Sequence, residues 1–197
     1  MKIVIIKYNA GNIQSVKFAL NRLGIEPIVS DNVNDILSAD KVIFPGVGEA
    51  SSAMNYLKEK QLDQVIKQLK QPVLGICLGM QLLCKHSEEG DTNCIGIFDA
   101  EIKKFNFGKD SELKVPQIGW NKIFNLKSDL FKGIKEKDYM YFVHGYYANL
   151  CNDTISVTDY GINYSSTLNK NNFFGVQFHP EKSAEVGEIL LANFIKM

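Results

Sequence analysis

The segment Val-Leu-Gly-Ile-Cys-Leu-Gly-Met-Gln, residues 73–81, places the narrowest limits on how this chain can fold. Its first part, from Val73 to Ile76, is a short apolar run after a proline, which is typical of a buried parallel strand. From Leu78 onward the spacing of the residues becomes helical. Cys77 is therefore expected on a sharp turn between a strand and a helix, with a glycine two positions away on each side.

Hydrolases place a nucleophile on a turn of this kind, because the turn projects the side chain away from the sheet. Gly75 and Gly79 would leave room for a substrate beside the Cys77 sulfur. Free N–H groups and the positive dipole end of the following helix favour a thiolate and a developing oxyanion. A buried structural cysteine in a core turn is the alternative, and this segment alone fits both.

The first half of the chain alternates strand-like and helical segments. Strands are expected at residues 2–7, 27–30, 41–44 and 73–76, and helices at 12–24, around 34–37 and over 50–69. Asn12 is expected to cap the first helix. Such alternation predicts an α/β fold: a doubly wound, mainly parallel sheet with flanking helices, whose ligands bind at the carboxyl ends of the strands.

The second half has few helices and many aromatic residues, and it is expected to add antiparallel strands to the sheet. Strands are expected at residues 96–104, 140–143, 154–159, 162–165 and 172–177, and a final helix over 183–195. We find no repeat and no break in composition. Residues 1–197 are therefore expected to form a single domain.

Composition excludes several classes of function. The 22 basic side chains match the 22 acidic ones, so no net charge would attract nucleic acid or an anionic membrane. No apolar run approaches the roughly 20 residues of a membrane span, and the first apolar run is too short for a secretory signal. The four cysteines have no C-x-x-C spacing, which indicates a cytoplasmic location, free thiols and no zinc site.

A second segment supplies the partners that Cys77 would need. It reads Gly-Val-Gln-Phe-His-Pro-Glu over residues 175–181. If the chain stays extended there, His179 and Glu181 project to the same side, and the carboxylate can orient the imidazole toward the sulfur. Either residue alone is more often structural. Together with the cysteine turn they favour a Cys-His-Glu relay of nucleophile, base and orienting acid.

These two segments resemble those of the class-I, triad-type glutamine amidotransferases. More narrowly, the chain is similar to the glutaminase subunits of imidazole glycerol phosphate synthase, and the similarity runs from end to end. The segments that carry it are Tyr8-x-Ala10-Gly11-Asn12, Pro45 to Gly48, Cys77 to Leu83, Pro116 to Asn121, Tyr141 to His144 and His179 to Ser183.

The resemblance implies a role for each residue of the relay. Cys77 would attack the carboxamide of glutamine, His179 would transfer protons, and Glu181 would orient the imidazole. The resemblance also implies an oxyanion hole, formed by the loop at Gly46–Gly48 and the backbone N–H of Leu78. From the residues alone, an ordinary tight loop is the favoured interpretation of this segment.

The resemblance further implies a glutamine-binding set. Gln81 would hold backbone groups of the substrate, Glu89 its ammonium, and the segment from His144 through Gly145 to Tyr146 its carboxylate. Without the resemblance, Gln81 would be interpreted as a helix surface residue, Glu89 as part of a solvated charge run, and His144 as a core histidine. The expected substrate-binding residues are Gly46, Val47, Gly48, Leu78, Gln81, Glu89, His144, Gly145 and Tyr146.

A partner is implied as well: a separate cyclase with a (β/α)₈ barrel, which receives the ammonia. In histidine biosynthesis that cyclase makes imidazole glycerol phosphate and an aminoimidazole carboxamide ribotide. Trp120 and Asn121 are expected to face the ammonia exit, and Lys182 to pair with an acidic residue of the cyclase. No metal and no organic cofactor is implied.

Two departures from the family pattern leave alternatives open. Lys7 and Asn9 differ from the usual opening Asp-Tyr-Gly-x-Gly-Asn, and Gly145 stands where serine or threonine is commoner. One alternative is a paralogous amidotransferase that serves another acceptor, such as a nucleotide-linked sugar. The other is a non-catalytic regulatory partner, which the intact Cys77 and His179 disfavour.

Overall fold

The structure is a computed structural model that describes residues 1–9, 11–108 and 111–197. Four parallel strands lie side by side in the order β2-β1-β3-β4. Their bounds are β1 Ile3–Ile6, β2 Ile28–Ser30, β3 Lys41–Gly46 and β4 Val73–Cys77. The connecting helices are α1 Ile13–Arg22, α2 Val33–Leu37, α3 Ala50–Glu59 and α4 Leu62–Gln68.

The second half extends this sheet beyond β4. Strand β13 pairs with β4 in parallel, and the order continues β13-β12-β10-β7-β5-β6, with β11 on the side of β12. Their bounds are β5 His86–Ser87, β6 Thr92–Asn93, β7 Glu101–Lys104, β10 Tyr146–Ala148, β11 Thr154–Asp159, β12 Asn163–Lys170 and β13 Phe173–Val176. Most of these added pairings are antiparallel.

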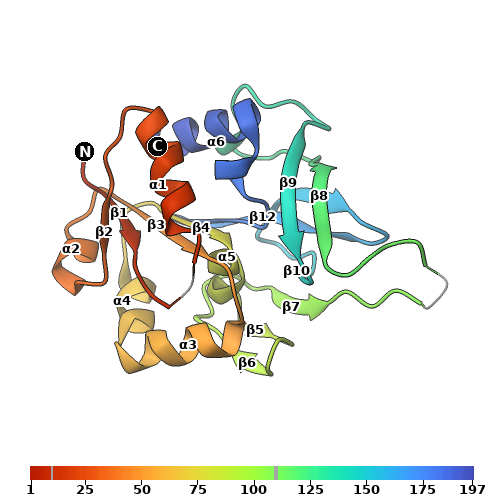
Figure 1. Cartoon of the computed structure of the whole chain (residues 1–197), viewed down its shortest axis with the longest axis horizontal. Coiled ribbons are helices and arrows are strands. Elements are labelled where there is room, and N and C mark those ends of the chain that lie inside the picture. Colours follow the sequence, from red (N-terminus) through yellow and green to blue (C-terminus); the bar gives the residue numbers. More distant parts are fainter. Residues whose placement is uncertain (10, 109–110) are drawn as a thin grey trace.

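A separate two-stranded ribbon stands beside the main sheet (Figure 1). It consists of β8 (Gln117–Lys122) and β9 (Tyr139–His144), which pair antiparallel. The remaining elements are the helices α5 (Leu78–Leu83) and α6 (Ala184–Lys196) and the 3₁₀ turns η1 (Asp129–Phe131) and η2 (Pro180–Lys182).

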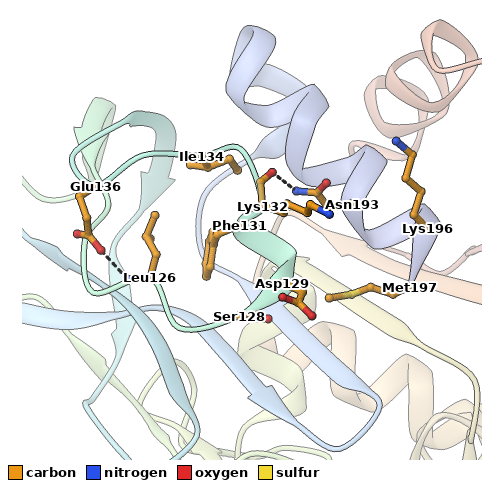
Figure 2. A pocket seen from close by; sticks show the side chains of 10 residues that line it. All are labelled: Leu126, Ser128, Asp129, Phe131, Lys132, Ile134, Glu136, Asn193, Lys196 and Met197. Atoms are coloured by element: carbon orange, nitrogen blue, oxygen red, sulfur yellow. Dashed lines mark hydrogen bonds between the residues drawn. The ribbon is translucent and has the colours of Figure 1, made fainter.

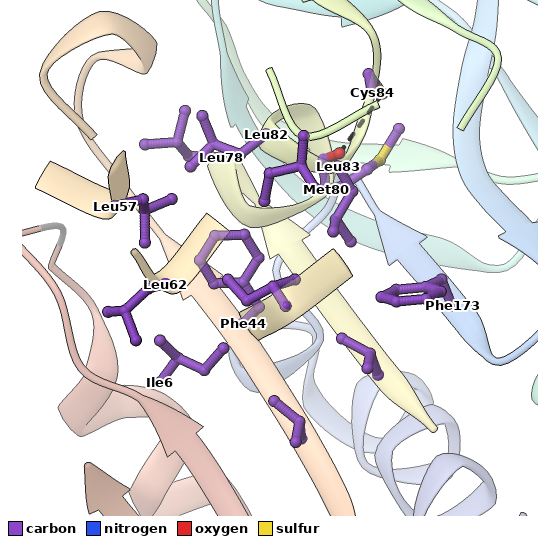
Figure 3. Close-up of a cluster of buried hydrophobic side chains, with 14 of the residues drawn as sticks. Ile6, Phe44, Leu57, Leu62, Leu78, Met80, Leu82, Leu83, Cys84 and Phe173 are labelled. Carbon is purple, nitrogen blue, oxygen red and sulfur yellow. Dashed lines mark hydrogen bonds between the residues drawn. The ribbon is translucent and has the colours of Figure 1, made fainter. Parts of the chain in front are cut away.

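Two apolar cores form because the central strands are buried on both faces. Alternate residues of β1 point to opposite faces: Ile6 joins the core under α3, α4 and α5, while Ile5 joins the core under α1 and α6. Figure 1 shows the helices on the two sides of the sheet. Figure 3 shows the first core, where Phe44, Leu57 and Leu78 lie together. This is the doubly wound, mainly parallel arrangement that the sequence predicts.

Several predicted boundaries were wrong. The single helix expected over 50–69 is two helices, because Gln61 has a left-handed backbone (φ 56°) and the chain turns there. The turn lets Leu57 and Leu62 bury in the same core. The strand expected over 96–104 begins only at Glu101. Strand β8 was not predicted, because its alternating exposure leaves apolar side chains such as Ile118 in solvent.

Among the described residues, we find no helix with the length and apolar character required to cross a membrane.

Gly79 allows α5 to lie directly on β3. A Cβ at this position would overlap the carbonyl oxygen of Phe44, and backbone atoms of Pro45 are also near. Helix α5 follows Cys77 directly, so this close approach sets the height of the cysteine above the sheet. The glycine expected to leave room for substrate thus has a packing role.

We predict that Gly79→Ala destabilises the fold by about 1–3 kcal/mol or more, because the backbone oxygen of Phe44 has no flexible end that can move aside. Denaturant unfolding measures the change. Gly108→Ala is the matched control, since no described atom lies within 4 Å of a Cβ placed there, and its stability should match that of the unmutated chain. Equal midpoints for the two variants would contradict the close packing of α5 on β3.

Candidate active site

Cys77 lies at the carboxyl end of β4, where the strand turns abruptly into α5. Its backbone has φ 53° and ψ −111°, a combination that costs energy for a residue with a side chain. Helix α5 begins at the next residue, Leu78, so the helix N-terminus faces the sulfur. The sulfur also lies 3.8 Å from the carbonyl oxygen of Val143 on β9. This is the sharp strand-to-helix turn that the sequence predicts.

His179 is brought to Cys77 by the pairing of β13 with β4. Val176 aligns with Ile76 in parallel register, so both strands end at the same edge of the sheet. The Nδ1 atom of His179 lies 2.7 Å from Oε1 of Glu181, and both side chains are buried. The chain does not stay extended through residue 181, because it enters the 3₁₀ turn η2 at Pro180. The turn still returns the carboxylate to the imidazole.

The backbone of His179 is fastened to strand β9. Its N–H donates to the carbonyl oxygen of Tyr141 at 2.8 Å. The hydroxyl of Ser183 donates to the His179 carbonyl at 2.6 Å and accepts from the Tyr141 N–H at 3.0 Å. Ser183 is fully buried. The imidazole is therefore held on the same strand that contacts the Cys77 sulfur.

Electrostatics favour a charged imidazole. Burial by itself would lower the pKa of His179, but the negative charge of the Cys77 thiolate and hydrogen bonds to Cys77 and Glu181 outweigh it and raise that pKa to about 10. At neutral pH the imidazole is thus protonated, beside Glu181 and the Cys77 sulfur. An imidazolium at this place can donate a proton to a group that reacts at the sulfur.

Asn12 is a further member of the site that the sequence did not reveal. Its backbone is left-handed (φ 73°), and its side chain does not cap α1 as expected. Instead, Nδ2 donates to Oε1 of Glu181, and it lies 3.4 Å from Nδ1 of His179. The other oxygen of Glu181 is buried without a partner among the described residues. Asn12 thus satisfies the oxygen that also holds the imidazole.

A cleft of about 230 Å³ opens over the sulfur. It contains eight of the nine residues expected to bind substrate, and the ninth, Gly46, ends β3 directly beside Cys77 in register. His179 lies in its wall, whereas Glu181 lies behind His179. The lining residues are Val47, Gly48, Cys77, Leu78, Gln81, Glu89, Val143, His144, Gly145, Tyr146, His179 and Lys182.

Two polar side chains of the cleft are fixed by other parts of the chain. The amide nitrogen of Gln81 donates to the Tyr146 carbonyl at 3.0 Å and to the side chain of Gln177 at 2.9 Å. One carboxylate oxygen of Glu89 accepts from the N–H of Ala50, at the start of α3, at 2.8 Å. Burial raises the pKa of Glu89, and this hydrogen bond opposes the rise. These hydrogen bonds therefore fix the orientation of the Gln81 and Glu89 side chains at the cleft.

The side chain of His144 is neutral, and its hydrogen bonds hold neighbouring parts of the chain in place. Burial lowers its pKa to about 4, with an opposing contribution from a hydrogen bond to Tyr146. Its Nδ1 lies 2.7 Å from the Tyr146 carbonyl oxygen, so this nitrogen carries the proton. Its Nε2 then faces the hydroxyl of Tyr164 at 3.2 Å. The ring thereby sets the position of the Gly145 and Tyr146 backbone at the cleft.

The residues expected at the partner surface line two different hollows. Trp120 is 52% exposed and packs edge-on against Tyr141, while the amide of Asn121 donates to the Asp159 carbonyl at 2.8 Å. Both line a shallow hollow outside the cleft that holds Cys77. Lys182 is exposed on η2 and lines the cleft itself. Residue Ala10 of the opening motif lies outside the described residues.

A larger cavity of about 740 Å³ lies elsewhere, between η1 and the end of α6 (Figure 2). Leu126, Phe131 and Ile134 give it an apolar wall, and Asn193 bonds to the Lys132 carbonyl beside it. It lacks a cysteine or histidine in its lining, so the smaller cleft at Cys77 is the candidate active site. The described residues contain no cluster of three or more histidine, cysteine or carboxylate side chains that could hold a metal ion.

Comparison with known proteins agrees with this geometry. Residues 4–197 match the family described as Glutamine amidotransferase class-I. The chain belongs to this family. Among its relatives is the imidazole glycerol phosphate synthase subunit HisH of Bacteroides fragilis, 54% identical over 197 residues that cover all of both chains. The HisH subunit of Yersinia pestis is 45% identical, again over the full length of both.

Solved structures share the amidotransferase fold at low sequence identity. A putative GMP synthase protein from Thermoplasma acidophilum superposes with a TM-score of 0.76 at 19% identity, covering 100% of this chain and 93% of that one. A structure described as glutamine amidotransferase gives a TM-score of 0.74 at 18% identity, covering 98% and 97%. The family relation and the fold therefore agree.

We predict that His179 of this amidotransferase stays protonated at neutral pH and loses its proton only as the pH rises through about 10. Nitrogen-15 NMR of the imidazole ring measures this. Cys77→Ala removes the charge that most strongly raises the pKa, so that pKa should fall. Cys84→Ala, at a second buried cysteine, should leave the titration unchanged. Titration of His179 near 6.5 in the unmutated chain would contradict the raised pKa of this imidazole.

Proposed function

We propose that this chain is the glutaminase subunit of an imidazole glycerol phosphate synthase in histidine biosynthesis. It hydrolyses glutamine to glutamate and ammonia. The observation that carries the proposal is the buried 2.7 Å contact of His179 with Glu181, at the wall of a cleft whose floor is Cys77. The name and full-length similarity of the HisH relatives support the assignment to this synthase.

The chemistry proceeds in two halves. The Cys77 thiolate attacks the carboxamide carbon, and the oxyanion that forms accepts hydrogen bonds from backbone N–H groups of Val47 and Leu78. His179 donates its proton to the leaving nitrogen, so ammonia departs and a γ-glutamyl thioester remains. Water then attacks the thioester while His179 takes up a proton, and glutamate and the thiolate are released. Glu181 stabilises the imidazolium throughout. Neither a metal nor an organic cofactor takes part in these steps.

Substrate glutamine is held by groups around the sulfur. Glu89, fixed by the Ala50 N–H, accepts the α-ammonium of glutamine. Gln81 and the backbone from Gly145 to Tyr146 bind the polar groups at the same end of the substrate. These contacts leave the carboxamide of glutamine directed at Cys77.

The ammonia passes to a separate cyclase with a (β/α)₈ barrel, in a cytoplasmic heterodimer. Residues 1–197 act as one glutaminase domain, and the barrel supplies the acceptor chemistry. The exposed Trp120, with Asn121 beside it, belongs to the docking face, and Lys182 at the rim of the cleft pairs with an acidic residue of the barrel. Glutamine-dependent cyclisation assayed with the cognate cyclase tests the whole proposal. Glutamine hydrolysis without cyclisation would instead indicate another acceptor.

We predict that Cys77→Ala abolishes glutamine-dependent activity, because no other group on the turn can form the thioester. Activity of the complex with free ammonia should survive, since that chemistry belongs to the partner. Cys94→Ala, at a half-buried cysteine on a different part of the chain, is the control and should keep glutamine turnover. Substantial glutamine hydrolysis by the Cys77 variant would rule out the proposed nucleophile.

We predict that Lys182→Glu reduces the stimulation of glutamine hydrolysis by the ligand-loaded cyclase, because the substitution places like charges at the contact. The rate of the isolated chain, measured in parallel, should change little. Lys196→Glu, near the chain end and beside the cavity in Figure 2, should leave the stimulation intact. Normal stimulation of the Lys182 variant would remove this residue from the interface.

A further inference from the structure

Tyr8 places a hydroxyl in the protein interior without a hydrogen-bond partner. The side chain is 6% exposed, and no described residue donates to or accepts from its hydroxyl oxygen. The ring packs against Phe44, with 5.2 Å between the ring centroids. A phenylalanine would fill the same apolar space without leaving a buried polar atom unsatisfied, so packing does not account for the hydroxyl.

The hydroxyl lies against the backbone of the loop above the cleft. A Cβ on Gly46 would collide with the Tyr8 oxygen, which places that oxygen next to the Gly46 Cα. Gly46 is also the register partner of Cys77, and the next residue, Val47, lines the cleft. The buried oxygen therefore adjoins the peptide that leads from β3 into the proposed oxyanion-binding loop.

This peptide has two polar groups that point in opposite directions, because the peptide unit is planar and trans. When the Val47 N–H points into the cleft, the Gly46 carbonyl oxygen must point away from it. Tyr8 belongs to the apolar core beneath the loop, together with Phe44 and Leu78. Gly48, at the end of this loop, has φ 124°, a conformation that favours glycine, and no described atom lies within 4 Å of a Cβ placed there.

We propose that the Tyr8 hydroxyl is a positioning group for this loop: it donates a hydrogen bond to the Gly46 carbonyl when the Gly46–Val47 peptide turns its N–H toward the Cys77 sulfur. This inference rests on the proposed glutaminase function, in which that N–H binds the oxyanion. In the present conformation the hydroxyl has no partner among the described residues. In the turned conformation the Tyr8 hydroxyl donates to the Gly46 carbonyl, and this hydrogen bond stabilises that conformation.

The protonation of Tyr8 fits this role. Burial raises its pKa far above the usual range, and the nearby Cys77 charge raises it further. The hydroxyl therefore keeps its proton at neutral pH and remains a donor. A donor below the carbonyl favours the orientation in which the N–H faces the reacting oxygen.

The test is Tyr8→Phe, which removes one oxygen and keeps the ring. Four quantities are measured: the thermal unfolding midpoint of the isolated chain, kcat and KM for glutamine hydrolysis by the complex with its cyclase, and the ammonia-driven activity of that complex. Tyr139→Phe is the matched control, because Tyr139 is 49% exposed at the opposite end of β9 from the cleft.

The expected midpoint of Tyr8→Phe is equal to or above that of the unmutated chain, since an unpartnered hydroxyl is lost. The kcat for glutamine should fall about fivefold to tenfold, the worth of one neutral hydrogen bond, with KM and ammonia-driven activity unchanged. Tyr139→Phe should change none of these. A lowered midpoint or an unchanged kcat for Tyr8→Phe overturns the inference. If the unmutated complex does not hydrolyse glutamine, the proposed function itself fails.

Discussion

The parallel hydrogen-bonding of β4 to its two neighbours is the constraint on which the rest of the site depends. Strand β3 on one side aligns Gly46 with Cys77, and β13 on the other carries His179 to the same sheet edge. Parallel strands that start in register end together, so three segments distant in sequence deliver their groups to one point. A shift of one residue in either pairing would turn the side chains to the opposite face.

The strained backbone conformation of Cys77 persists because the surrounding elements hold the chain in place on both sides. The φ of 53° is imposed by the strand on one side and by α5 on the other, which lies directly on β3 at Gly79. Behind the imidazole, Ser183 and the turn η2 fix the backbone in the same way. The unfavourable local geometry is thus offset by packing spread over both cores, and a nucleophile stays exposed to the cleft on an otherwise buried turn.

Local patterns were sufficient for the elements that determine the site. The apolar run before Cys77, the glycines around it and the pair His179 and Glu181 indicated the strand, the turn and the relay. Tertiary contacts determined what the patterns missed. Asparagine commonly caps helices, so Asn12 was expected to do so. The approach of α1 to η2 directs its amide to Glu181 instead. Short or half-exposed strands such as β8 and β10 have no periodicity of their own and exist through their partners.

The position of β13 has a consequence for the growing polypeptide. A hundred residues separate Cys77 from Gln177, which follows β13, so β4 lacks that neighbour while the intervening antiparallel strands are synthesised. At translation rates of about 5–20 residues per second, this interval lasts on the order of 5–20 seconds. During it the sulfur has neither its imidazole nor the closing wall of the cleft. The catalytic cleft of a nascent chain on the ribosome is therefore incomplete until the last strand has entered the sheet.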